Sequence, residues 1–418
     1  MTPKGGGLAS RPRATRRDRA SLEFHLLVLV TLGLVAFGLV MVYSASSARG
    51  LLASGSPAYY LERQALYAGV GLVFLVVLSR LDYHALRRAG GPLLVTSLVL
   101  LVAVLVIGTT VNGARRWLPL GAFGFQPSEL AKLAVAMWLA ATLVRRGTPR
   151  SVGELLRPIG LVVALTGALL LAEPDLGTAI ALTVMVGAML VVAGTPLRVL
   201  AGSGSIGLSI FLLAIWLEPY RRARLFSFLD PWSDPQGAGF QTVQAMIALG
   251  SGGIFGVGLG ESVQKVYYLP EASTDMIFAI IGEELGLLGA VSVILAFVAF
   301  GYAGFNVALR CRDPFGKRLA AGLTALVCGQ ATVNLCAVMG IAPLTGIPLP
   351  FVSYGGSSLI VALAAVGILL NIAQNHAVEA VAQVPHRGRG NGRTRPARDR
   401  RRRGADRPRR QRQLRRVS

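Results

Sequence analysis

The sequence predicts an all-α, polytopic membrane protein with about ten transmembrane helices and one long loop between the seventh and eighth. Three observations support this fold class. Of the 418 residues 53% are hydrophobic, only 15% are charged, and the mean hydropathy is +0.58. A soluble domain usually carries about 25% charged residues. The apolar residues also gather in runs separated by short polar segments, and the net charge of +22 is concentrated at the two ends of the chain.

Ten apolar runs are candidates for spanning helices, since about 20 apolar residues cross a bilayer as a helix. The first follows a basic segment without an evident small-residue cleavage site, so we expect a retained helix rather than a signal peptide. The predicted spans are residues 26–43, 66–78, 93–111, 130–144, 159–172, 176–193, 199–217, 276–300, 319–341 and 357–372.

The ends of the chain differ in composition from the body. Residues 1–21 form a basic N-terminal tail, residues 22–376 the membrane domain, and residues 377–418 an Arg-rich tail that we expect to be disordered. From residue 385 onward there are 15 arginines and two aspartates. Binding to anionic lipid headgroups explains such tails better than nucleic-acid binding, which we do not expect. The three cysteines show no metal or redox spacing.

The distribution of Arg and Lys predicts the orientation of the chain in the cytoplasmic membrane. With both termini in the cytoplasm, the inner loops hold a clear excess of basic residues: Arg80, Arg87, Arg88, Arg145, Arg146, Arg150, Arg157, Arg198, Arg310, Arg312, Lys317 and Arg318. Fewer fall on the outer side: Arg49, Arg63, Arg115, Arg116, Arg221, Arg222, Arg224 and Lys265. The outer group runs against the usual bias, so we expect an anionic ligand there.

Residues 218–274 form the long extracytoplasmic loop, and loops of this length are usually functional or disordered. Within it, residues 239–249 are typical of a short amphipathic helix at the bilayer surface. Residues 250–260, GSGGIFGVGLG, predict a flexible backbone. They lack the Gly-Lys-Ser/Thr of a nucleotide-binding loop.

The stretch 265–289 changes from polar to apolar where the eighth span begins. Ser273, Thr274 and Asp275 lie at this junction and are residue types that cap helices. Glu283 and Glu284 follow inside the apolar run, where an acid is costly unless it is paired or used. One interpretation is that Asp275 only caps the helix and the glutamates face a neighbouring helix. The other is a functional site.

Three further polar segments fall on the same predicted side. In the first, Ser128 is placed to cap the fourth span, and Lys132 enters the membrane one turn after Glu129. A lysine near a helix N-terminus opposes the macrodipole and requires an acid, either Glu129 or one on another helix. We expect Asp275 to be that partner. The other two segments are Glu173-Pro174-Asp175 and the Pro/Gly-rich stretch 346–358, which contains Ser353 and Ser357.

Several motifs resemble the SEDS family (shape, elongation, division and sporulation) of polytopic glycosyltransferases. They occur in family order from about residue 26 to 372: GARRWLPLG with QPSELAKL, EPDLGTA, FLDPWSDPQGAGFQ with GSGGIFGVGLGESVQK, YLPEASTDMIFAIIGEELGLLG, and PLPFVSYGGSSL. The central motifs are most similar to the cell-division branch, whereas GIPLPFVSYGGSS is also typical of the elongation branch. Ser273 departs from the His that many members carry before Thr-Asp, which weakens any proton-shuttle role at this position.

The resemblance implies a ten-helix fold that polymerises lipid II into glycan strands. It also implies that the chain works with a class B penicillin-binding protein as transpeptidase and with other divisome proteins. Asp275 is then the essential acid, with Lys132 and Arg116 in the same outer cavity. Chemically, we assign Asp275 as general base, and Arg115, Arg116 and Lys132 as candidates to stabilise the diphosphate. The remaining candidate substrate-binding residues are Glu129, Glu173, Asp175, Glu271, Ser353 and Ser357.

A divalent cation, Mg²⁺ or Mn²⁺, is an alternative means of stabilising the leaving group. Whether Asp275 binds such a metal stays open at this point. Three alternative functions also stay open: an elongation polymerase of the same family, a flippase for lipid II, and a non-catalytic division scaffold.

Overall fold

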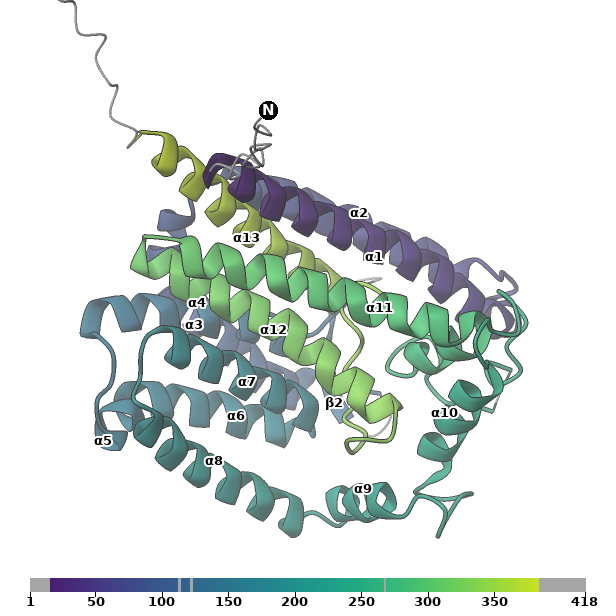
Figure 1. The fold of residues 1–418 in the computed structure, drawn as a ribbon. Coiled ribbons are helices and arrows are strands. Elements are labelled where there is room, and N and C mark those ends of the chain that lie inside the picture. The colour runs from purple at the N-terminus through teal and green to yellow at the C-terminus, as the bar shows by residue number, and fades with distance from the viewer. Residues whose placement is uncertain (1–15, 112–113, 121–122, 267, 383–418) are drawn as a thin grey trace, which may run out of the picture.

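The structure, a computed structural model, describes residues 16–111, 114–120, 123–266 and 268–382 (Figure 1). Most of the two predicted tails lies outside these residues. The first helix starts at Arg16, within the predicted N-terminal tail 1–21. The last helix continues to Ala382, within the predicted C-terminal tail 377–418. In chain order the helices are α1 (Arg16–Ser54), α2 (Tyr59–Arg80), α3 (Tyr83–Ile107), α4 (Pro127–Arg146), α5 (Val152–Leu155), the π-turn η1 (Leu156–Gly160), α6 (Leu161–Ala172), α7 (Leu176–Val192), α8 (Leu197–Leu217), α9 (Pro219–Leu229), α10 (Phe240–Ser251), α11 (Ile277–Arg310), α12 (Pro314–Val338) and α13 (Gly356–Ala382).

Within the described part of the chain, nine helices are long and apolar enough to cross a membrane, and the 17-residue α7 is a shorter apolar helix. All ten predicted spans therefore fall on helices. The all-α prediction is correct for the bundle. One exception is a small antiparallel sheet of β1 (Thr109–Val111), β2 (Ala114–Leu120) and β3 (Phe123–Phe125) on the connection between α3 and α4. The third span was predicted through residue 111, but α3 ends at Ile107 and β1 follows.

The centre of the bundle is built from α4, α12 and α13. In their apolar stretches 83%, 78% and 83% of the residues are buried. The closest packing pairs are α13 with α2, α3 with α4, α11 with α12 and α12 with α7. In contrast, only 11% of the apolar stretch of α8 is buried, and its main contacts are with α5 and α9. Figure 1 shows α8 and α9 bowing away from the other helices.

Helix α11 is broken at Gly286, whose φ of 66° and ψ of −161° lie outside the helical region. Residues 253–258 supply the missing hydrogen-bond partners. Two of their N–H groups donate to the carbonyl oxygens of Glu283 and Glu284, each at 3.0 Å, and two of their carbonyl oxygens accept from N–H groups just after the break, at 2.9 and 3.3 Å. Irregular backbone at membrane depth is tolerated only where it is buried in protein or lines a cavity. The prediction of a flexible Gly-rich segment is therefore wrong over these residues, because their backbone completes the helix.

The rest of the long outer loop is also ordered into helices. Helix α10 confirms the predicted short helix, but the helix packs against α11, and its buried residues include Val243, Ala245 and Ala248. Helix α9 was not predicted from the sequence. Its Arg222 lies over the ring of Trp216, with 5.7 Å between the guanidinium carbon and the ring centroid. Arg222 is thus partnered within the protein.

Candidate active site

The four polar segments singled out in the sequence meet at one end of the bundle, around the loop 346–358. Asn334 of α12 donates to the carbonyl oxygens of Asp275 and Ile347, at 2.7 and 2.8 Å. The backbone N–H of Tyr354 donates to the carbonyl oxygen of Ser273 at 2.8 Å. On the other side of the loop, Ser357 donates to the carbonyl oxygen of Gly124 at 3.1 Å. The sequence prediction that these segments share one face is consistent with these contacts.

Asp275 does not cap α11. The helix begins at Ile277, its N-cap is Met276, and no side-chain capping hydrogen bond is present. The interpretation of Asp275 as a simple helix cap is therefore wrong. The carboxylate is half-buried, and the Thr274 hydroxyl lies 3.3 Å from its Oδ1 and 2.9 Å from Oε2 of Glu271. One hydroxyl thus lies between two carboxylates.

The surroundings of Asp275 favour its protonated form. Burial raises the pKa of Asp275 to about 7, and the neighbouring Glu271 carboxylate adds to the rise, while Arg224 and Thr274 oppose it. Glu271 itself adopts a left-handed backbone conformation with φ of 56°. Such a conformation in a non-glycine residue costs about 1–3 kcal/mol and is concentrated at functional sites. Burial and Glu271 therefore bring the pKa of Asp275 closer to neutral pH than that of an exposed aspartate.

Lys132 pairs with Glu129 and not with Asp275. Their charged atoms are 2.8 Å apart, and the two residues are 1% and 3% exposed. The predicted Lys132–Asp275 pair is thus wrong: three residues along one helix place Glu129 directly beside the lysine. The expected Ser128 cap is also absent. Gln126 occupies the N-cap position of α4, and the buried Ser128 hydroxyl has no hydrogen-bond partner among the described residues.

The two neighbouring arginines point to different places, because side chains alternate along a strand. Arg115 is exposed and donates to the carbonyl oxygen of Leu105 at 3.4 Å. Arg116 donates to the carbonyl oxygens of Glu173 and Pro174, at 3.0 Å for the first. Arg116 therefore fixes the turn between α6 and α7, and Arg115 has the more accessible guanidinium.

The turn between α6 and α7 contains two acids with different surroundings. Asp175 caps α7, accepting from the Thr178 N–H at 3.1 Å and from its hydroxyl at 2.8 Å. Glu173 is 0% exposed, and neither carboxylate oxygen has a hydrogen-bond partner among the described residues. Burial raises the pKa of Glu173 to about 8. The neighbouring Asp175 carboxylate adds to the rise, and the positive charge of Arg116 opposes it. The raised pKa thus favours the neutral form of Glu173.

Ser353 and Ser357 hold backbone in place. The Ser353 hydroxyl accepts from the Leu349 N–H at 2.8 Å, and its carbonyl oxygen accepts from Gln64 at 3.0 Å. The Ser357 hydroxyl accepts from the Gln126 N–H at 3.1 Å. Both serines thus shape the loop that carries the site.

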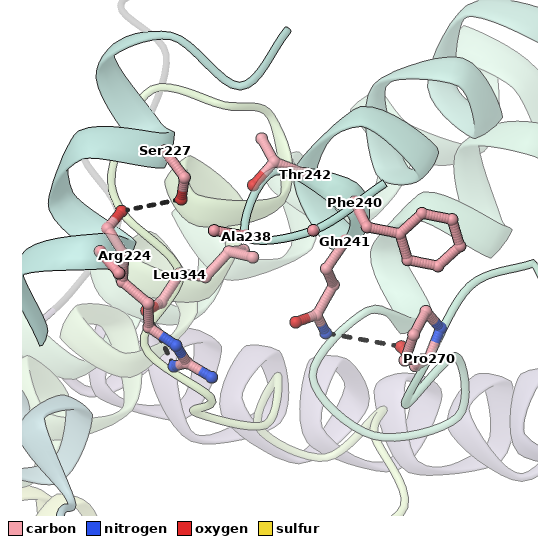
Figure 2. Close-up of a pocket in the computed structure, with 10 residues that line it drawn as sticks. Arg224, Ser227, Ala238, Phe240, Gln241, Thr242, Pro270 and Leu344 are labelled. Carbon is pink, nitrogen blue, oxygen red and sulfur yellow. Dashed lines mark hydrogen bonds between the residues drawn. The ribbon is translucent and has the colours of Figure 1, made fainter. Parts of the chain in front are cut away.

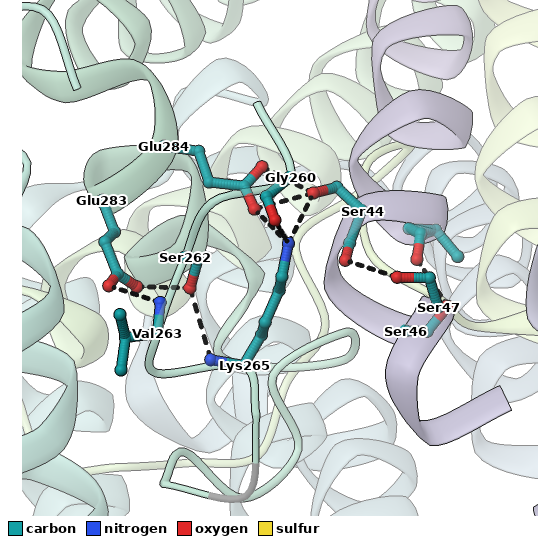
Figure 3. Close-up of polar contacts among 10 residues, drawn as sticks. Ser44, Ser46, Ser47, Gly260, Ser262, Val263, Lys265, Glu283 and Glu284 are labelled. Atoms are coloured by element: carbon teal, nitrogen blue, oxygen red, sulfur yellow. Dashed lines mark hydrogen bonds and ion pairs between the residues drawn. The ribbon is translucent and has the colours of Figure 1, made fainter. Parts of the chain in front are cut away.

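A second polar cluster explains the glutamates of α11 (Figure 3). Glu284 forms an ion pair with Lys265 at 2.8 Å and accepts from the Ser44 hydroxyl of α1 at 2.6–2.7 Å. Glu283 accepts from the Ser262 hydroxyl and from the Val263 N–H, the latter at 3.0 Å. The prediction that the outer basic residues need an anionic ligand is therefore wrong for Lys265, whose partner lies within the protein.

A cavity of about 300 Å³ borders the segment before Asp275 (Figure 2). Arg224 of α9 lines it and was missed as a site residue, as was Asn334. Each carries a sequence signal that was available. Arg224 is a basic residue on the outer side, and Asn334 is an amide inside an apolar span, which requires a hydrogen-bond partner.

Among the described residues no three His, Cys, Asp or Glu side chains cluster as a metal site.

Comparison with known proteins places this geometry in context. Residues 24–378 match a family of cell cycle proteins comprising FtsW, RodA and SpoVE. The probable peptidoglycan glycosyltransferase FtsW of Trichlorobacter lovleyi is 43% identical over 354 residues, which are 84% of this chain and 93% of that protein. The stage V sporulation protein E of Bacillus subtilis is 41% identical over 363 residues, covering 84% and 96%.

Solved structures show the same fold. A structure described as a peptidoglycan synthase complex that coordinates polymerization and crosslinking matches with a TM-score of 0.70 and 32% identity, over 84% of this chain and 97% of that one. The rod shape determining protein RodA of Thermus thermophilus matches with a TM-score of 0.63 and 30% identity, over 84% and 96%. With its many apolar helices the chain is an integral membrane protein, and it belongs to the FtsW/RodA/SpoVE family of cell cycle proteins.

Proposed function

We propose that this protein is a peptidoglycan glycosyltransferase that polymerises lipid II into glycan strands at the outer face of the cytoplasmic membrane, for the septal wall. The relatives named FtsW at 41–43% identity support this activity and the division branch. The observation that carries the proposal is Asp275. It is a half-buried carboxylate without a capping role and with a pKa of about 7, at the meeting point of the polar segments.

In the proposed reaction the 4-hydroxyl oxygen of the acceptor sugar attacks the anomeric carbon of the donor. The bond to the polyprenyl diphosphate breaks, and the electron pair leaves with the diphosphate. The hydroxyl proton passes to Asp275, the general base. A single displacement of this kind inverts the anomeric configuration.

The other residues have distinct roles in the proposal. Arg115 has the exposed guanidinium, so it is best placed to meet the diphosphate. Arg116 positions the turn with Glu173 and Asp175 through its two backbone contacts. Lys132 acts through Glu129, holding the start of α4. Where Mg²⁺ or Mn²⁺ takes part, Glu271 and Asp275 are the carboxylate pair that could hold it together with substrate phosphates and water.

The loose packing of α8 supports a substrate carried on a lipid. Nearly the whole second half of this helix is exposed, including Leu208, Leu212 and Trp216 at 52–64%. In a bilayer such a surface is covered by acyl chains, and a polyprenyl chain is chemically equivalent to them. We infer that the lipid part of the substrate reaches the site from this side.

The partner and orientation belong to the same proposal. The match to a peptidoglycan synthase complex supports a class B penicillin-binding protein as transpeptidase partner, alongside other divisome proteins. The excess of basic residues in the predicted inner loops supports cytoplasmic termini. Figure 1 agrees with the even number of spans, since the start of α1 and the end of α13 lie at the same end of the bundle.

The test is polymerisation of lipid II by the purified protein, with and without its transpeptidase partner, read as polymer on a gel. Asp275→Asn is expected to abolish polymer while keeping the fold. The matched control is Glu261→Gln, an exposed acid of the same outer loop, which is expected to leave polymerisation unchanged. Transport of lipid II across vesicles without polymer would establish a flippase. Neither activity, with partner binding intact, would establish a scaffold.

A further inference from the structure

The cavity of about 300 Å³ on the outer loop layer is not used by the roles assigned above. Figure 2 shows its walls, which come from α9, α10 and three connecting segments. They include the end of the motif FLDPWSDPQGAGFQ, from Gly237 to Gln241, whose family resemblance brought no role with it. The lining residues that matter here are Arg224, Ser227, Ala238, Phe240, Gln241 and Leu344.

One wall of the cavity is a preformed turn. Asp234 accepts from the N–H groups of Ala238 and Gly239, each at 3.0 Å. A Cβ added at Gly239 would lie 2.1 Å from the carbonyl oxygen of Pro231, so this position requires glycine. The turn therefore presents Ala238 to the cavity in a fixed position.

The other walls are joined to the segments that flank Asp275. Arg224 donates to the carbonyl oxygen of Leu344 at 3.3 Å, and Leu344 is two residues from Gly346, where a Cβ would lie 3.9 Å from Oδ2 of Asp275. Gln241 lies 3.5 Å from the carbonyl oxygen of Pro270, the residue before Glu271. The cavity thus borders both backbone segments that hold the base.

The chemistry of the lining selects the class of ligand. The cavity offers hydroxyl, amide and backbone groups, whereas the ring of Phe240 points away from Ser227 and Ala238 (Figure 2). Arg224 is its one charged lining residue, and it is close enough to the Asp275 carboxylate to oppose the rise of that group's pKa. Because this cation already faces acids, the cavity suits an uncharged ligand better than a diphosphate. Its volume is at the lower end of the range for ligand pockets, about 300–1,000 Å³, which is room for one sugar ring.

We propose that this cavity is the acceptor subsite: it holds the terminal N-acetylated sugar ring of the acceptor, with the 4-hydroxyl directed to Asp275. This inference rests on the proposed glycosyl transfer and adds where the acceptor binds. Ser227 and Gln241 bind the hydroxyl and acetamido groups of the ring. The diphosphate of the donor binds elsewhere.

The experiment measures donor and acceptor separately in the reconstituted complex with the transpeptidase partner. A lipid II whose 4-hydroxyl is blocked serves only as donor. A lipid II analogue with carbon in place of the anomeric oxygen serves only as acceptor. Ala238→Trp fills the cavity from an exposed turn, and Gln236→Trp adds the same bulk to the same turn outside the cavity.

Ala238→Trp is expected to raise the KM for the acceptor about tenfold or more, with the donor KM and kcat within about twofold of wild type. Gln236→Trp is expected to leave both KM values unchanged, and Gln241→Ala to raise the acceptor KM by a smaller factor. Should Ala238→Trp not purify with its partner, Ser227→Leu tests the same cavity from the opposite wall.

A rise in the donor KM alone, an unchanged acceptor KM, or an equal effect of Gln236→Trp would overturn the subsite. Failure of the wild-type complex to couple the two substrates would be a different result. It would refute the proposed glycosyl transfer itself.

Discussion

Replacing Lys132 by Met is expected to destabilise the protein strongly through Glu129. The lysine and the glutamate are 1% and 3% exposed and 2.8 Å apart, so the change leaves a carboxylate buried without its partner. Removing one member of a buried ion pair costs about 3–5 kcal/mol. At about 2 °C per kcal/mol for a large domain, the midpoint of thermal unfolding should fall by about 6–10 °C.

The assay is thermal unfolding in detergent, with lipid II polymerisation measured on the same samples. Lys317→Met, at a half-buried lysine of α12, is the matched control and should barely change the midpoint. The double variant Glu129→Gln with Lys132→Met removes both charges, so it should regain most of the stability and part of the activity.

Two results would refute this reasoning. An unchanged midpoint for Lys132→Met would show that the pair does not stabilise the fold. A stable but fully inactive double variant would place Lys132 on the substrate itself rather than behind Glu129.

Three further predictions concern Asp275, Glu173 and the break in α11. Since Asp275 with a pKa of about 7 must be ionised to accept a proton, the rate of polymerisation should rise with pH through about 7. Glu271→Gln removes a charge that raises this pKa and should move the midpoint of the rate profile to lower pH; a shift upward would contradict the assignment. The pKa of Glu173 is raised from 4.5 to about 8 in the folded protein, so its contribution to stability is full below pH 4.5 and is lost as pH rises to 8. In the Glu173→Gln variant the midpoint of thermal unfolding should depend less on pH over this range. An unaltered pH dependence of the midpoint would exclude Glu173 as its cause. Gly286→Ala should lower the unfolding midpoint by several degrees, because the position has φ of 66° and a Cβ would lie 2.4 Å from the N of Gly256, whereas the same change at the open Gly33 of α1 should not; equal midpoints would show that the break tolerates a side chain.

Local patterns were sufficient to predict the helices and to group the polar segments. Apolar runs of suitable length located all ten spans, and the Pro/Gly-rich stretch 346–358 correctly pointed to irregular backbone. These features depend on composition and spacing along the chain. They do not require knowledge of which helix is next to which.

Several of the missed features depend on how segments pack against one another. The partner of Lys132 was open between a neighbour on its own helix and Asp275, and only packing decides between them. Glu284 meets Ser44, 240 residues away in sequence. The break at Gly286 exists because the Gly-rich segment supplies hydrogen bonds to it, and neither stretch alone indicates the other.

The break in α11 has a mechanical consequence. The outer part of the helix, Ile277 to Leu285, is joined to the membrane part by a single non-helical residue, but to the outer loop by two hydrogen bonds and the Glu283 and Glu284 side chains. The same loop segment accepts hydrogen bonds from Leu287 and Leu288 on the membrane side of the break, so a displacement of the outer loop reaches both sides of it. A protein bound to the outer loop would thus move the helical turns after Asp275 together with the membrane part of α11.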